Sequence, residues 1–190
     1  MSFAKKVFFP LISLFLAYRS YELVKVILKL SPEEVSIVGA ASLSFMLTLF
    51  VTGIFAFVGF AYPTHRVLPA SYYVVSKPES LMALYRLLGV SYFRKFLLIT
   101  FWGKPKNRKK YFDGSKAGLA NFDYQTKQSE FGHLAAFVCL SLLSIPLIQA
   151  EHWTLLLFIT VINVLANFYP IVLQRVHRIQ IQKLRARILS

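Results

Sequence analysis

Charged residues are scarce in this chain, and acidic residues are the scarcest of them. Only 16% of its 190 residues are charged, with 22 Lys and Arg against 8 Asp and Glu, whereas a soluble domain usually carries about 25%. Hydrophobic residues make up 56% of the chain. Because the chain has few charged residues and many hydrophobic ones, its composition indicates a membrane protein. The length suits a single integral membrane domain over residues 1–190.

The chain also lacks the residues and motifs of several functional classes. It has one cysteine, Cys139, which excludes an intrachain disulfide and a cysteine-based metal site. It has no Gly-rich phosphate loop, no G-x-S-x-G nucleophile elbow and no recognised nucleic-acid-binding motif. Its histidines are scattered, so we expect neither a metal site nor a cofactor. Because the basic residues flank apolar segments, we attribute them to contact with anionic lipid and expect no nucleic-acid partner.

Four apolar segments predict transmembrane helices. They cover about residues 7–29, 35–62, 131–150 and 152–175. The first is interrupted by Arg19, Glu22 and Lys25 on one face, and it either spans the membrane or lies in the membrane interface. The second has no charge and is longer than the roughly 20 residues that a span needs. Only Glu151 separates the last two, which predicts a helical hairpin.

A long basic loop, residues 63–130, connects the second and third predicted helices. Residues 78–88 within it predict a short helix. Residues 92–102 are too short to span a membrane and are bounded by cations and aromatics, which is typical of an interfacial or re-entrant segment. The basic run at residues 104–110 is typical of a surface that faces lipid headgroups.

Lys and Arg gather on one side of the four predicted spans. The N-terminus, the basic loop and the basic C-tail, residues 176–190, share that side. The opposite connections hold Glu33, Glu34 and Glu151. Because positive charge accumulates on the cytoplasmic side of membrane proteins, we predict an all-α, multi-pass protein with both termini and the basic loop in the cytoplasm.

Glu130 and His133 lie where the loop enters the third predicted helix. Residues three apart share a helix face. A carboxylate beside an imidazole can orient it and raise its basicity, which suits a general base. The same pair also suits an interfacial anchor that only fixes the end of the helix.

Polar residues continue along the fourth predicted helix. Asn163, Asn167, Pro170, Gln174 and Arg178 follow a 4-3-4-4 spacing, which places them on one stripe. The stripe predicts either a wet, inward-facing groove or side chains that hydrogen-bond a neighbouring helix.

Three arginines are placed to converge near the predicted membrane surface. Arg66 follows the second helix, and Arg175 and Arg178 end the fourth. Together they suit the phosphates of an acyl carrier, a nucleotide-linked donor or a lipid headgroup. Alternatively, each is ordinary charge at the cytoplasmic end of a helix.

The spacing of these polar residues resembles that of a known family. The matching residues are Thr126, Lys127, Glu130 and His133, then Asn163, Ala166, Asn167, Pro170, Ile171, Gln174, Arg175 and Arg178, with Leu68, Pro69, Tyr72, Tyr73 and the Asp113-Gly114 turn upstream. This pattern resembles the glycosyl-4,4'-diaponeurosporenoate acyltransferase family, whose members are small integral membrane proteins of bacterial carotenoid biosynthesis. The resemblance covers roughly residues 60–180. One departure is Val176-His177, where the family continues with an aromatic residue and Asn.

The resemblance implies an O-acyltransferase of a bacterial inner membrane, which moves a fatty acyl group onto a hydroxyl of a glycosylated isoprenoid or another amphipathic lipid. His133 would be the catalytic base and Glu130 its orienting partner. The implied site-lining residues are Asn163, Asn167, Gln174 and Arg175. From their predicted convergence with Arg175, we add Arg178 and Arg66 as substrate-binding residues. Expected partners are membrane lipids, an acyl thioester donor and a lipid-like acceptor, with room for a protein partner or a second copy. The alternative is a non-catalytic accessory or structural subunit of a larger membrane complex.

Overall fold

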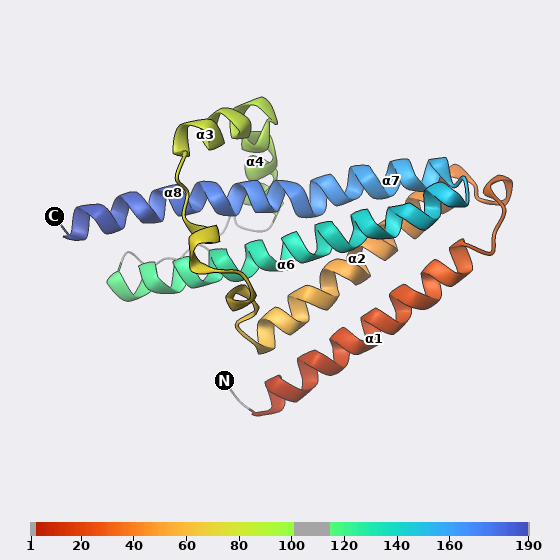
Figure 1. Cartoon of the computed structure of the whole chain (residues 1–190), viewed down its shortest axis with the longest axis horizontal. Helices are drawn as coiled ribbons and strands as arrows, with labels where there is room; N and C mark the ends of the chain where they lie inside the picture. The colour runs from red at the N-terminus through yellow and green to blue at the C-terminus, as the bar shows by residue number, and fades with distance from the viewer. Residues whose placement is uncertain (1–2, 101–114, 190) are drawn as a thin grey trace. The chain divides into compact units, whose positions relative to one another are not determined.

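The computed structural model describes residues 3–100 and 115–189, and within them every regular element is a helix (Figure 1). In chain order the elements are α1 (Phe3–Ile27), η1 (Pro32–Glu34), α2 (Ile37–Ala61), η2 (Thr64–Val67), η3 (Ala70–Tyr73), α3 (Pro78–Leu87), α4 (Val90–Thr100), α6 (Lys116–Gln149), α7 (Trp153–Asn163), the π-helix η4 (Val164–Phe168) and α8 (Tyr169–Leu189). The predicted basic run at residues 104–110 and the Asp113-Gly114 turn lie outside the described residues.

Four helical stretches of the described chain are long and apolar enough to cross a membrane. They are Phe3–Ile27, Ile37–Ala61, Gly118–Gln149 and Trp153–Arg187. The last combines α7, η4 and α8 in direct succession. The predicted all-α fold with four candidate spans is therefore confirmed, and the predicted short helices of the basic loop correspond to α3 and α4.

Two of these helices are longer than the sequence predicts. Helix α6 begins at Lys116, although the prediction placed residues 116–130 in the loop. Its first turns bury Leu119, Asp123 and Glu130 along one face, so polar residues there pack inward instead of marking a loop. Helix α8 likewise continues to Leu189 through the predicted C-tail.

By its internal contacts the chain divides into two compact units, which we describe separately. Unit 1 comprises Met1–Thr64 and Gly132–Phe168, and unit 2 comprises His65–Phe131 and Tyr169–Ser190. The predicted single domain stays a prediction.

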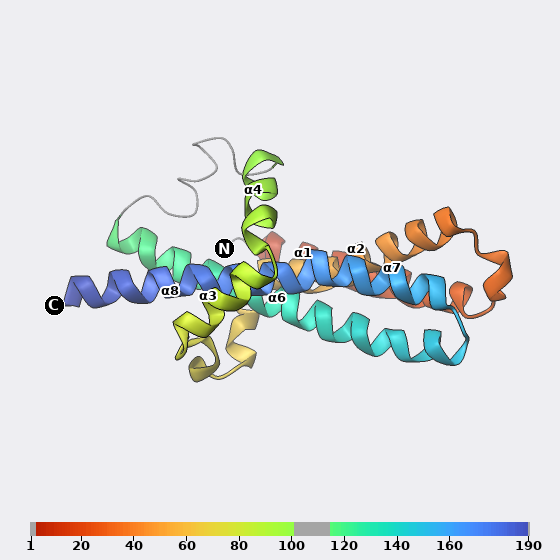
Figure 2. The ribbon, with the colours of Figure 1, turned by 90° about the horizontal axis from the view of Figure 1, so that it is seen from above.

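In unit 1, α1 and α2 pack along each other and α7 packs on α2 (Figures 1 and 2). Gly53 allows the first contact, since a Cβ there would lie 2.7 Å from Leu16 Cδ1. The Ser13 hydroxyl donates to the Ile54 carbonyl at 2.9 Å. The buried core of the unit comprises Ile27, Ala40, Leu47, Val51, Ala136, Leu140, Leu147, Leu155 and Ile159.

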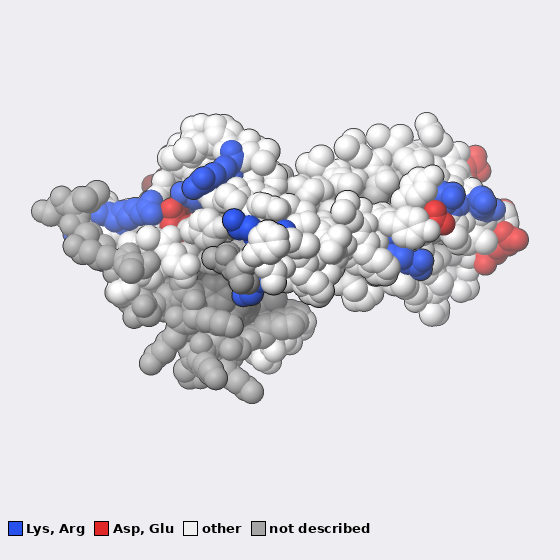
Figure 3. Space-filling view, turned by 90° about the horizontal axis from the view of Figure 1, so that it is seen from below, with Lys and Arg blue, Asp and Glu red and all other residues white. Residues whose placement is uncertain are grey.

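The outer face of unit 1 is apolar. Leu14, Phe45, Leu142 and Leu157 are each more than half exposed, at 67%, 57%, 60% and 61%. Soluble monomers seldom expose so many large apolar side chains on neighbouring elements, whereas helices in contact with lipid do. The face shown in Figure 3 agrees: its described surface is mostly uncharged, with the charged side chains in a few patches.

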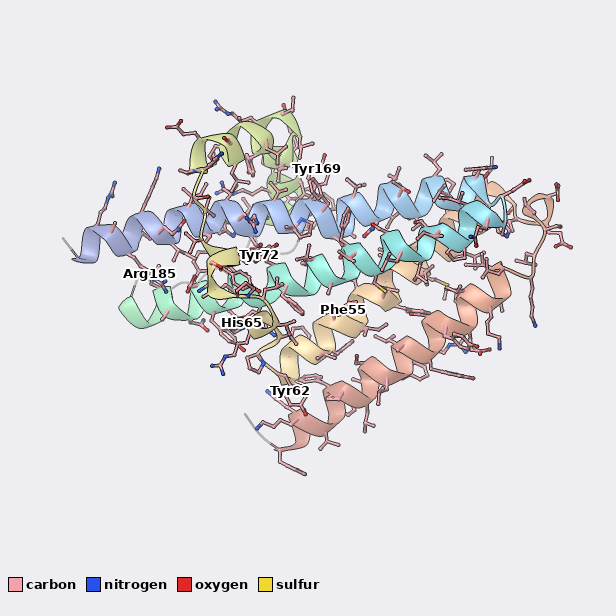
Figure 4. The ribbon with its side chains drawn as sticks, in the orientation of Figure 1. Phe55, Tyr62, His65, Tyr72, Tyr169 and Arg185 are labelled. Carbon is pink, nitrogen blue, oxygen red and sulfur yellow. The ribbon has the colours of Figure 1, made fainter. Side chains whose placement is uncertain are left out.

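In unit 2, α3 and α4 both pack on α8. Gly89 joins α3 to α4 with a φ of 63°, a conformation that glycine adopts without steric cost. The Tyr169 hydroxyl (Figure 4) donates to the Leu88 carbonyl at 2.8 Å, and its ring stacks on Phe93. These contacts fix the start of α8.

Candidate functional site

Unit 1 contains a chain of hydrogen-bonded amides within its apolar helices. Asn163 ends α7 and is 3% exposed, while Asn167 lies in η4 and is fully buried. The Asn163 Nδ2 donates to the Phe137 carbonyl of α6 at 3.1 Å, and the Asn167 Nδ2 donates to Asn163 Oδ1 at 3.0 Å. These bonds satisfy polar groups that would be costly to bury alone.

This amide chain ends at a histidine. Asn167 Oδ1 lies 3.0 Å from His133 Nδ1 and accepts a hydrogen bond from the Thr52 hydroxyl at 3.2 Å. We call His133, Asn163, Asn167 and Thr52 the amide–histidine chain. Thr52 comes from α2, His133 from α6 and the two asparagines from α7 and η4, so three separate parts of the sequence build it.

Donor and acceptor requirements then assign the histidine tautomer. A backbone carbonyl only accepts, so Asn163 must turn its amino group to Phe137 and its oxygen to Asn167. Asn167 in turn presents its oxygen to His133. Because an amide oxygen also only accepts, a neutral His133 ring carries its proton on Nδ1, and Nε2 holds the basic lone pair.

The π-helix η4 lies in the middle of this arrangement. A π-turn accommodates an extra residue, and such turns are frequent at functional sites. Here it contains Asn167 and follows directly on Asn163. The stripe predicted from regular α-helical spacing is therefore interrupted at this point, and the amide pair is a local feature of unit 1.

Unit 2 contains a second polar assembly, built on ions. Glu130 is fully buried; its Oε1 accepts from Arg175 Nε at 2.9 Å, and its Oε2 lies 2.6 Å from Arg178 Nη2. Arg175 Nη2 also donates to the Tyr72 carbonyl at 3.2 Å, and Arg178 Nη1 donates to the Tyr73 carbonyl at 3.3 Å. We call these five residues the arginine–tyrosine cluster.

The two tyrosines of this cluster cover the guanidinium groups. The Arg175 guanidinium lies 4.6 Å from the centre of the Tyr72 ring (labelled in Figure 4), and that of Arg178 lies 4.9 Å from the Tyr73 ring. Both distances suit cation–π contact. Burial raises the pKa of Tyr72, and burial with the nearby Glu130 charge raises the pKa of Tyr73 to about 12. Both phenols therefore stay protonated at neutral pH.

The predicted site residues are thus divided between the two units. His133, Asn163 and Asn167 come together in unit 1, whereas Glu130, Arg175 and Arg178 come together in unit 2. Gln174 is also in unit 2, where its Nε2 donates to Ser129 Oγ at 3.3 Å. His133 hydrogen-bonds the Asn167 side chain and the Ala166 backbone, and Glu130 forms ion pairs with the two arginines. Arg66 is exposed and has no ion pair among the described residues.

Three residues of these assemblies were not predicted as site residues: Thr52, Tyr72 and Tyr73. Thr52 lies in an uncharged span, where a hydroxyl usually bonds its own helix, so the sequence holds no signal for it. Tyr72 and Tyr73 did appear in the family resemblance, which was the available signal. Within the described residues no group of three His, Cys, Asp or Glu side chains could hold a metal ion.

Comparison with known proteins gives one match. A family model described as glycosyl-4,4'-diaponeurosporenoate acyltransferase matches residues 69–187, which is more than half of the chain. The matched range contains the whole arginine–tyrosine cluster and all of the amide–histidine chain except Thr52. No curated protein and no solved structure matches the chain.

Proposed function

Because the chain belongs to the glycosyl-4,4'-diaponeurosporenoate acyltransferase family, we propose that it is a membrane-embedded O-acyltransferase. It moves a fatty acyl group from a thioester donor to a hydroxyl of a glycosylated isoprenoid or another amphipathic lipid. The exposed apolar surface of unit 1 supports contact with lipid and access for such an acceptor. The clustering of basic residues in the loop and C-tail supports a bacterial inner membrane with both termini in the cytoplasm.

The observation that carries the proposal is the hydrogen bond of 3.0 Å between His133 Nδ1 and Asn167 Oδ1. Asn167 occupies Nδ1, so the other ring nitrogen is the one that can accept a proton. A histidine held in one tautomer by a hydrogen bond from its second nitrogen is the usual form of a general base. In this proposal Asn167 takes the orienting role that the sequence suggested for Glu130.

The reaction then proceeds in two proton transfers. His133 Nε2 takes the proton from the acceptor hydroxyl, whose oxygen attacks the thioester carbonyl and forms the new C–O bond. When the C–S bond breaks, the imidazolium returns the proton to the departing thiolate. Throughout both transfers the ring keeps its Nδ1–H bond to the fully buried Asn167, which holds Nε2 in one orientation.

The proposal is tested by a substitution at His133 with a matched control on the same helix. Purified protein is given a radiolabelled acyl thioester and a glycosylated isoprenoid, and the acylated product is measured. His133→Gln should lower kcat by about 10²- to 10⁴-fold, the usual contribution of a general base. Ser144→Ala should leave kcat unchanged, since that hydroxyl donates to the Leu140 carbonyl of its own helix, which is not part of the amide–histidine chain.

Folding is monitored in parallel through the thermal unfolding midpoint in detergent. A His133→Gln protein that unfolds at the wild-type temperature and still transfers acyl groups at the wild-type rate would refute the proposed role.

A further inference from the structure

The arginine–tyrosine cluster carries one positive charge that no carboxylate in it neutralises. Glu130 supplies one negative charge, whereas Arg175 and Arg178 supply two positive charges. The Arg178 side chain is 2% exposed and Glu130 is fully buried, so water screens this excess poorly. A buried cation without a counter-charge is costly. The cluster is therefore built to be completed by an anion.

Hydrogen-bond donors in the cluster also remain available. A guanidinium has five N–H groups. Arg175 uses one on Nε for Glu130, one on Nη2 for the Tyr72 carbonyl and one for the Tyr72 hydroxyl, so it has more N–H groups than these three acceptors use. The buried Arg178 Nε has no acceptor among the residues that the structure describes. Guanidinium N–H groups lie in one plane and match the oxygens of a phosphate or carboxylate.

Exposure decides which arginine such an anion can reach. The Arg175 side chain is 27% exposed, against 2% for Arg178. The Tyr72 ring centre lies 4.6 Å from the Arg175 guanidinium carbon, so an anion would reach the exposed N–H groups of Arg175 beside this ring. Arg178 is buried and bound to Glu130 and to the Tyr73 carbonyl, so it would attract the anion through its charge without contacting it.

The neighbouring ions of unit 2 add to the positive potential. Asp123 is 7% exposed and pairs with both Lys127 and Arg185, at 2.8 and 2.9 Å. This second group again holds one acid and two bases. It lies near the cluster, since the Lys127 ammonium is 6.0 Å from the centre of the Tyr73 ring. An anion at Arg175 therefore lies in a region of positive electrostatic potential.

We propose that the exposed guanidinium of Arg175, supported by the charge of the buried Arg178, binds a phosphate group. This inference rests on the proposed acyltransferase function and names a ligand of that site, which is either the thioester donor or a bound lipid. The phosphate belongs either to the carrier of a soluble acyl thioester or to a lipid headgroup. Both present the same oxygens to the guanidinium, and binding experiments distinguish them.

The test uses pairs of probes that differ by their phosphates. Protein in a phosphate-free maltoside detergent is titrated with coenzyme A or pantetheine, and separately with dihexanoyl phosphatidic acid or dihexanoylglycerol. We expect one phosphate-bearing probe to bind at least about tenfold more tightly than its phosphate-free counterpart. Tight binding of coenzyme A identifies a soluble carrier, and tight binding of phosphatidic acid identifies a headgroup.

Four variants connect that binding to the cluster. Arg175→Gln should weaken it at least about tenfold, and Arg175→Lys should weaken it less because the charge is kept. Arg86→Gln removes an equal charge from an exposed position on α3 and should change the affinity for the phosphate-bearing probe less than about twofold. Glu130→Gln should strengthen phosphate binding, because the substitution increases the excess positive charge of the cluster and keeps the shape of the side chain. If Glu130 had only a structural role, its substitution would not strengthen phosphate binding.

Two results would overturn the inference: equal binding by Arg175→Gln and the wild type, or equal weakening by Arg86→Gln and Arg175→Gln. Neither result touches the proposed function if the wild type still transfers acyl groups. Conversely, Arg175-dependent phosphate binding in a protein without transferase activity would leave this site in place and remove the function. His133→Gln should bind the phosphate probe as tightly as the wild type.

Discussion

The two units bury polar side chains by opposite means. Unit 1 uses neutral groups, in which each amide of the amide–histidine chain donates and accepts in turn without formal charge. Unit 2 uses ions, with one buried carboxylate between two guanidinium groups. A neutral chain fixes where a proton resides, whereas an unbalanced ionic cluster attracts an anion. Buried polar side chains in an apolar protein can therefore serve different kinds of chemistry.

Removing the buried carboxylate should produce the largest loss of stability. Glu130→Met leaves two guanidinium groups without their counter-charge, and breaking a buried pair in this way costs about 3–5 kcal/mol. The measurement is chemical unfolding in detergent, with Glu79→Met on the exposed surface of α3 as control. A loss of stability no larger than that of the control would show that the cluster is not held by its charges.

Interrupting the neutral chain should have a smaller effect on stability and a selective effect on activity. Asn167→Leu removes the partners of His133, Thr52 and Asn163 at once, and such losses cost about 1–3 kcal/mol. Acyl transfer should fall by about 10- to 100-fold, because the tautomer is no longer fixed. Asn163→Leu leaves the bond to His133 in place and should lower activity less. Equal losses would contradict the orienting role of Asn167.

Alkaline pH should weaken unit 2 through Tyr73. Its pKa is raised to about 12 in the folded protein, chiefly by burial, while in the unfolded chain it is about 10. The unfolded state therefore releases the proton first, so stability is unaffected below pH 10 and falls as the pH rises from 10 towards 12. Unfolding midpoints at pH 9 and 11 should differ less for Tyr73→Phe than for the wild type; an equal difference would contradict this assignment.

The smallest effect should follow substitution of Arg66. The sequence placed this residue with Arg175 and Arg178, but it is exposed and has no ion pair among the described residues. Arg66→Gln should change stability by less than about 0.5 kcal/mol. It should also weaken phosphate binding much less than Arg175→Gln. If Arg66→Gln weakened phosphate binding as much as Arg175→Gln, Arg66 would be part of the binding site.

Much of the fold follows from the sequence because lipid imposes a simple rule. Apolar segments of roughly 20 residues have few alternatives to a spanning helix, and a helix long and apolar enough to span is present at each of the four predicted places. The beginning of α6 was missed because residues 116–130 mix polar and apolar side chains. Their pattern is that of an amphipathic helix, with Asp123 and Glu130 turned inward to meet arginines of α8.

The site was predicted in part for a related reason. Helical spacing tells which side chains share a face, and it put Asn163 beside Asn167 correctly. It does not tell which distant segment lies opposite that face. Glu130 therefore has its partners 45 and 48 positions away on α8, and the π-helix that contains Asn167 has no signature in composition.

The position of the proton on the neutral His133 ring decides whether this residue can be the base. Nitrogen NMR of protein with labelled histidine, compared with His133→Gln to assign the signal, distinguishes the two neutral tautomers. We expect the proton on Nδ1 in the wild type and a mixture of tautomers in Asn167→Leu. A wild-type ring that carries its proton on Nε2 would rule out the proposed base, since the nitrogen that must take the proton of the acceptor hydroxyl would already be occupied.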